Sequence, residues 1–286
     1  VVAGKVPFMY SPFYSYNGRG TRAQLVYKND GVKLVSFVGV KDEFTDNDID
    51  EWDDNDFMEY GVVGKVDMTS GWVLKFYGKY VDDQRTHEWV TTDGVDTLMP
   101  HTDTTGFTGD IHLNNSGKED CMLNIEAEVG YKAADLQGTE DDGIGGYAMI
   151  SKKMDRFTPA VVAGMTQNGY VADDDFGLIM VGGDTPITVV DVGNADGDLW
   201  FGAFVASYEI SPKLTVTGNI LYADYDNNTD GNITDAIEVS ASASYAVLDN
   251  AELVYGIGYL TPGYDDDAGS LEDAYFGHYL QLALSF

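Results

Sequence analysis

The last segment of the chain, AYFGHYLQLALSF, alternates between apolar residues and other residues without a break. A period of two residues indicates a β-strand, because successive side chains of a strand point to opposite faces of the sheet. The strand is long for a soluble sheet, in which about five or six residues are usual. One face holds Phe276, His278, Leu280, Leu282, Leu284 and Phe286, and the other holds Tyr275, Gly277, Tyr279, Gln281, Ala283 and Ser285.

The same alternation recurs upstream in KLTVTGNILYADY, DAIEVSASASYAV and AELVYGIGYL, and no segment shows comparable helical spacing. The sequence therefore predicts an all-β fold with about 14 antiparallel strands of about 10 residues each. We expect them to form a single domain over residues 1–286. The expected strands cover residues 1–8, 20–29, 32–41, 57–68, 72–82, 106–115, 121–133, 145–154, 158–167, 198–210, 213–225, 235–247, 251–261 and 274–286.

Tight turns alternate along the chain with long, acidic connections. The turns, such as Lys28-Asn29-Asp30-Gly31, are rich in the residues that turns require. The connections include DEFTDNDIDEWDDND and residues 168–197. Short turns at one end of a sheet and long loops at the other are typical of an outer-membrane β-barrel. Within the connection at 168–197, we expect residues 176–190 to form a folded loop hairpin, because each half is too short to cross a bilayer.

The composition narrows the classes of partner and of fold. The chain has 48 acidic and 16 basic side chains, a net charge of −32 at pH 7. This balance argues against nucleic acid as a partner and against docking on an anionic membrane surface, because both need basic patches. The 19 tyrosines and 13 phenylalanines argue against a disordered chain. The single cysteine, Cys121, excludes an internal disulfide and a CxxC metal site.

The alternation also places the charged side chains. If the apolar set of each strand faces lipid, the polar set faces the interior of the barrel. Charges left unpaired among apolar side chains would cost several kcal/mol each, so the pattern predicts a water-filled interior. The predicted pore-lining set comprises Arg22, Lys28, Lys33, Glu59, Lys65, Asp67, Lys75, Lys79, Glu126 and Glu128. No recognisable nucleophilic serine and no HExxH motif occurs, so we do not expect an enzyme.

Two stretches resemble Gram-negative outer-membrane porins. The opening, VVAGKVPFMYSPFYSYNGRGTRAQLVYKNDGVKLVSFVGVKDEF, resembles the part of general porins around the constriction loop. There a strand with a GK or GR pair precedes an aromatic, glycine-bearing loop that folds into the pore. The carboxyl-terminal half, from DLWFGAFVASYEISPKLTVTGNILYADYD to the final phenylalanine, resembles the last strands of porins of sulfate- and metal-reducing bacteria. Together these stretches cover about half of the chain.

The resemblance implies passive diffusion through a homotrimer in the outer membrane, surrounded by lipid bilayer and lipopolysaccharide. It also implies that residues 8–20 form the constriction loop. Porins reach this motif only after several earlier strands. Two interpretations stay open: amino-terminal strands are missing from this chain of about 14 strands and the complete barrel has 16 or 18, or the chain forms a compact barrel that only resembles porins. The implied constriction residues are Tyr14, Tyr16 and Arg19, with Lys5, Arg22 and nearby lysines in a basic wall.

One acidic connection resembles a calcium-binding loop. Asp226, Asn228 and Asp230 stand at alternate positions before Gly231, as at the start of an EF-hand loop. Ile237 occupies the twelfth position, where that loop requires a glutamate. Two interpretations stay open: calcium bound at this and other acidic extracellular loops, or an ordinary acidic external turn. No other cofactor is expected.

The sequence thus predicts passive diffusion of small hydrophilic solutes and ions. Because the long loops carry most of the negative charge, we expect a mild preference for cations. One alternative is a substrate-selective outer-membrane channel, for which Tyr14, Tyr16 and Tyr77 are candidate stacking residues. Another is a soluble, secreted, calcium-binding β-sandwich.

Overall fold

The computed structural model describes most of the chain. Its described ranges are residues 2–5, 21–43, 56–69, 71–84, 87–92, 95–100, 104–115, 123–172, 176–183, 185–193, 197–226, 233–248, 250–264 and 274–284.

One antiparallel sheet of 14 strands makes up most of the described residues. The expected all-β fold with about 14 strands is therefore confirmed, and most strand ends fall within two or three residues of the expected positions. The strands of this sheet are β1 (Val2–Lys5), β2 (Thr21–Asn29), β3 (Val32–Glu43), β4 (Asp56–Asp67), β5 (Val73–Asp83), β8 (Thr104–Asn114), β9 (Asn124–Lys132), β10 (Gly143–Ser151), β11 (Phe157–Gln167), β12 (Asp198–Ser211), β13 (Leu214–Asp226), β14 (Ile233–Leu248), β15 (Ala251–Tyr264) and β16 (Tyr275–Leu284).

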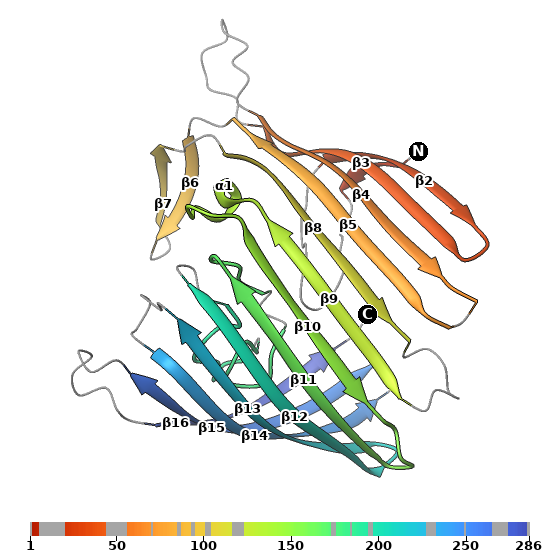
Figure 1. Cartoon of the computed structure of the whole chain (residues 1–286), viewed down its shortest axis with the longest axis vertical. Helices are drawn as coiled ribbons and strands as arrows, with labels where there is room; N and C mark the ends of the chain where they lie inside the picture. The colour runs from red at the N-terminus through yellow and green to blue at the C-terminus, as the bar shows by residue number, and fades with distance from the viewer. Residues whose placement is uncertain are drawn as a thin grey trace, which may run out of the picture.

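The strands follow one another in the sheet in the order of the sequence, interrupted only by the hairpin between β5 and β8. The sheet curls, so that β14, β15 and β16 pass behind and below the strands that precede them (Figure 1). Among the described residues, no pairing joins β1 to β16. This single curled sheet differs from the two packed sheets of a β-sandwich.

Two elements within the long connections were not expected from the sequence. A separate hairpin consists of β6 (His87–Thr92) and β7 (Val95–Pro100), between β5 and β8. The sequence feature that indicates this hairpin is the Asp93-Gly94 pair between its strands, because Asp-Gly is typical of hairpin turns. A single helical turn, α1 (Ala134–Gln137), follows β9 and ends at Gly138 in the left-handed conformation, with φ 72°. No helix in the described part of the chain is long and apolar enough to cross a membrane.

The two faces of the sheet are inverted relative to a soluble protein. Large apolar side chains on the convex face are exposed on strand after strand, including Leu25, Tyr60, Phe107, Ile111, Val129, Val161, Trp200, Phe204, Ile220, Val239, Tyr255 and Leu280. Charged and polar side chains on the concave face are buried, including Glu59, Lys79, Asp110, His112, Glu128, Asn219 and Glu238. This arrangement agrees with the predicted parity of the strands and suits a convex face that contacts hydrocarbon.

If the convex face contacts lipid, a charge placed on it destabilises the fold. Val239 lies outward and exposed near the middle of β14, whereas Ser242 lies inward on the same strand. We expect Val239→Lys to lower the free energy of unfolding by about 2–4 kcal/mol in phospholipid vesicles, measured by denaturant titration. The matched control, Ser242→Lys, should cost markedly less. Equal and small effects at the two positions would contradict a lipid-facing convex surface.

Candidate pore lining and constriction

A buried ion pair connects the inward faces of β4 and β5. The Nζ atom of Lys79 lies 2.8 Å from Oε1 of Glu59, and the two side chains are 7% and 2% exposed. Both residues belong to the predicted pore-lining set, and the structure brings them together. Buried ion pairs of this kind are sensitive to substitution of either partner.

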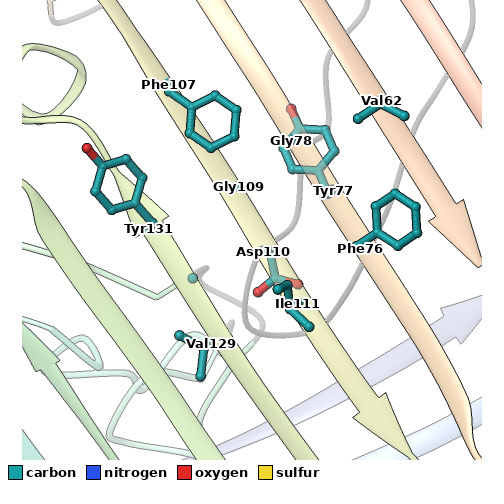
Figure 2. A pocket seen from close by; sticks show the side chains of 11 residues that line it. Val62, Phe76, Tyr77, Gly78, Phe107, Gly109, Asp110, Ile111, Val129 and Tyr131 are labelled. Carbon is teal, nitrogen blue, oxygen red and sulfur yellow. The ribbon is translucent and has the colours of Figure 1, made fainter.

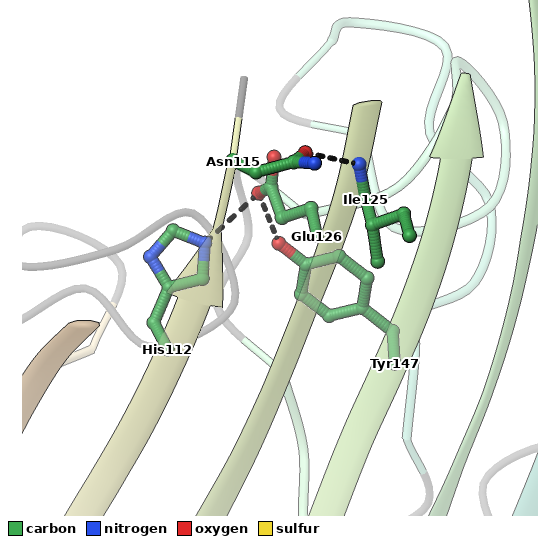
Figure 3. Close-up of polar contacts among 5 residues, drawn as sticks. All are labelled: His112, Asn115, Ile125, Glu126 and Tyr147. Carbon is green, nitrogen blue, oxygen red and sulfur yellow. Dashed lines mark hydrogen bonds and ion pairs between the residues drawn. The ribbon is translucent and has the colours of Figure 1, made fainter. Parts of the chain in front are cut away.

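A second polar group joins the next three strands (Figure 3). Glu126 on β9 receives a hydrogen bond from the Tyr147 hydroxyl at 2.6 Å, and its Oε1 lies 3.1 Å from Nε2 of His112. At the end of β8, Asn115 Oδ1 accepts a 2.6 Å hydrogen bond from the backbone N–H of Ile125. The carboxylate of Glu126 thus links β8, β9 and β10 on the inward face.

The connection between β11 and β12 folds into the concave side of the sheet (Figure 1). We call residues 170–193 the inward segment. It packs against inward side chains of β10 to β15, and buried members of the joint core include Tyr170, Ile179, Met180, Val192, Leu199, Phe201, Leu221 and Leu260. The expected water-filled interior is therefore restricted: β4, β5, β8 and β9 carry buried charges, whereas much of the inward face from β10 to β15 is covered by an apolar core.

Glu238 holds the inward segment against β14. Its carboxylate is fully buried and accepts three backbone N–H hydrogen bonds, from Ile179 at 3.1 Å, Met180 at 3.1 Å and Val181 at 2.9 Å. The three amides belong to a segment that forms no strand, so the carboxylate supplies partners that a sheet would otherwise supply. The inward segment also lies close to β15. A Cβ atom added at Gly258 of that strand would lie only 2.6 Å from the Met180 side chain.

The chain turns inward at Asn168 and Gly169, which both have left-handed backbone conformations, with φ 54° and 77°. The Asn168 N–H donates to Asp198 Oδ1 at 3.0 Å, and its side-chain amide donates to the Asp142 carbonyl at 3.1 Å. The Asp142 carboxylate accepts hydrogen bonds from the Tyr131 hydroxyl and the Ala134 N–H, and these lower its pKa. The entrance to the inward segment is thus fixed to the adjoining connection.

The other predicted pore-lining residues have varied surroundings. Glu128 is buried on β9, next to Glu126 along the inward face. Lys65 is exposed and forms an ion pair with Asp67 at 2.9 Å on the same strand. Lys28 and Lys33 are exposed, and Lys75 is half-buried.

Several predicted residues lie outside the part that the structure describes. Tyr14, Tyr16 and Arg19 fall within residues 6–20, and Asn228 and Asp230 within 227–232, whereas the backbones but not the side chains of Lys5 and Arg22 are described. A constriction at residues 8–20 and calcium at Asp226 therefore stay predictions. Among the described residues, no group of three or more His, Cys, Asp or Glu side chains could hold a metal ion.

Sequence reasoning did not identify the inward segment as a part that narrows the interior. It expected only a folded loop hairpin at residues 176–190, and the structure shows a folded loop without regular strands there. The available signal was the apolar stretch FGLIMV, which stands in an otherwise acidic connection. The alternation in DAIEVSASASYAV puts Glu238 among the polar set of its strand, but its three backbone partners lie 57 to 59 residues away along the chain.

A hollow of about 490 Å³ lies across β5, β8 and β9, mostly on the convex side (Figure 2). It forms where Gly78 and Gly109 leave space beside Phe107, and a Cβ built at Gly78 would lie 3.1 Å from that ring. Its other convex-face side chains, such as Val62, Ile111 and Val129, are apolar. The hollow therefore belongs mainly to the outer, apolar surface, and Tyr77 and Asp110 of the inward face also border it.

No protein-family model matches the chain, and no curated protein matches it. Several solved outer-membrane channels show some structural similarity. The outer membrane channel DcaP of Acinetobacter baumannii is 13% identical, with a TM-score of 0.42 over 92% of this chain and 83% of that one. The NanC porin is 10% identical, with a TM-score of 0.42 over 80% of this chain and 94% of that one. The Pseudomonas putida toluene transporter TodX is 10% identical, with a TM-score of 0.38 over 85% and 77%. At this level of similarity, function has to be inferred from the chain's own residues.

Removing the charge of Glu238 should loosen the inward segment. We expect Glu238→Gln to accelerate amide hydrogen exchange at residues 179–181 by about tenfold or more, because charge-assisted hydrogen bonds contribute about 1.5–3 kcal/mol each. The measurement is hydrogen–deuterium exchange read by mass spectrometry.

The matched control is Glu209→Gln, which breaks the exposed Lys153–Glu209 ion pair at 2.9 Å. It should leave exchange in the inward segment unchanged. If Glu238→Gln had no more effect than this control, the carboxylate would not be the anchor.

Proposed function

We propose that the chain forms an outer-membrane channel for passive diffusion of small hydrophilic solutes and ions. The observation that supports this most is the inverted sheet, in which exposed apolar side chains cover the convex face and charged side chains face inward. A soluble β-sandwich would place its apolar face inside. A membrane channel needs apolar side chains toward lipid and polar ones toward water.

The proposal includes closure of the sheet into a barrel. Unpaired backbone N–H and C=O groups at a strand edge are costly in hydrocarbon, because no water is present to bind them. We therefore propose that the edges of β1 and β16 are joined, either to each other or through further strands, to give a barrel of up to about 16 to 18 strands.

The inward segment would set the width of this channel. It projects from one side of the sheet, and the Glu59–Lys79 pair and the Glu126 group lie on the inward face of strands β4 to β10. A solute would then pass between an apolar, anchored loop and a charged face. Such a passage favours small polar solutes, and no reaction or energy source is required.

Several further parts of the proposal come from the sequence and from its resemblance to porins. They are the homotrimer, contact with lipopolysaccharide, a second constriction at residues 8–20, calcium at acidic loops, and a mild preference for cations. The preference for cations follows from acidic residues in the long connections, such as DEFTDNDIDEWDDND. These residues would concentrate cations at the end of the channel where the long connections lie.

The channel should conduct, and its small-ion current should favour cations. We expect stepwise conductance when the refolded protein is added to planar lipid bilayers, and a reversal potential of the cation-selective sign in a KCl gradient. A parallel assay, swelling of proteoliposomes in small neutral sugars, tests solute passage. Folded protein, judged by heat-modifiable migration on gels, that gave neither current nor swelling would contradict the channel. An anion-selective reversal potential would contradict only the cation preference.

A further inference from the structure

Four lysines occupy directly opposite positions on four consecutive strands. Lys28 on β2 pairs with Lys33 on β3, Lys33 pairs with Lys65 on β4, and Lys65 pairs with Lys75 on β5. We call Lys28, Lys33, Lys65 and Lys75 the lysine row. Directly opposite side chains in antiparallel strands have Cβ atoms about 4.5–5.5 Å apart, so the row is continuous.

The row lies on the inward face, close to the end of the sheet that has the short turns. Lys28 and Lys33 flank the turn between β2 and β3, and Lys65 and Lys75 flank the turn between β4 and β5. In register with Lys75, the next strand carries His112 and the one after it Glu128. The lysine row therefore ends at Lys75, and His112 and Glu128 continue the same line of inward side chains on β8 and β9.

This arrangement is unfavourable by itself, because like charges directly opposite each other on neighbouring strands repel. Among the described residues, Lys65 has an ion-pair partner, Asp67, whereas Lys28, Lys33 and Lys75 have none. The nearby carboxylate of Glu126 is already engaged by His112 and Tyr147.

The row also contrasts with the rest of the chain. It gathers four of only 16 basic residues in a protein with a net charge of −32. Its side chains are exposed or half-buried, and a solute can reach them.

We propose that the lysine row binds a solute that carries several anionic groups in line, such as an oligophosphate or a polycarboxylate. Neighbouring strands are about 4.8 Å apart, so the four strands span about 14 Å. A solute with anionic groups spaced along that length can contact successive ammonium groups. The proposal rests on the proposed channel, since it identifies a solute class for the mouth at the short turns.

The lysine row is exposed to water, so binding there is weak enough to be compatible with transport. Ammonium groups in contact with water are screened by salt, so each contact is weak, and affinity comes from several contacts together. A solute held in this way is released easily, as conduction requires. Monovalent anions, which reach one or two lysines, would bind far less.

The test is titration calorimetry on the refolded full chain in detergent at low salt. The probes are tripolyphosphate and propane-1,2,3-tricarboxylate, with chloride as the monovalent comparison. We expect at least one polyanion to bind, and Lys28→Gln with Lys33→Gln to weaken that binding by about tenfold or more. Which probe binds decides between a phosphate and a carboxylate solute.

The matched control is Lys152→Gln with Lys213→Gln. It removes the same charge from two exposed lysines in short turns between other strands. This control should bind the polyanion nearly as well as the unmodified chain. The proposal is overturned if neither polyanion binds, or if both double variants lose affinity equally.

Current measurements separate this proposal from the channel itself. The same polyanion, added on the side of the short turns, should reduce the current of the unmodified channel more than that of the Lys28 and Lys33 variant. Binding without any current would contradict the channel and leave the site standing. Current without binding would contradict the site and leave the channel standing.

Discussion

The hydrogen-bonded register between neighbouring strands is the constraint on which the rest of this molecule depends. Each strand assigns alternate residues to opposite faces, and the register aligns those residues into rows across the sheet. A shift of one residue in one strand would turn its apolar set inward and its charges toward the convex face. The inverted faces, the Glu59–Lys79 pair and the lysine row all follow from the same alignment.

The two sides of the interior are stabilised in different ways. On β4 and β5, the buried charged side chains of Glu59 and Lys79 satisfy each other. From β10 to β15, a loop without strands covers the sheet and contributes apolar side chains such as Ile179 and Met180 to a common core. Backbone polar groups of such a loop need partners, and Glu238 provides three of them from the strand behind.

The sequence predicted the strands well because alternation is a local property. Leu280, Leu282 and Leu284 reveal their strand and its apolar face without reference to any other part of the chain. Pairing is not local. Irregularities between Val40 and Asp42, and between Glu209 and Ser211, shift the register in ways that alternation does not show.

The candidate site was predictable to a similar degree. Each lysine of the row was expected on the inward face, but their alignment needed the pairing of four strands. Glu238 stands on the polar parity of its strand, yet its role depends on backbone amides that lie 57 to 59 residues earlier in the chain. The β6–β7 hairpin was missed because its strands are short and lie within a connection that reads as acidic loop.

The neck of the inward segment has a consequence for how the interior of the curled sheet can change. The Gly169 N–H donates to the Gly197 carbonyl at 3.3 Å, and the Ala172 N–H donates to the Val192 carbonyl at 2.8 Å. Beneath this closed neck, β11 and β12 remain paired up to Thr166 and Leu199. The segment is thus a module that hangs from a finished hairpin. Its length and sequence can be exchanged while the frame of strands stays as it is, so the inward segment and the sheet that carries it can evolve separately.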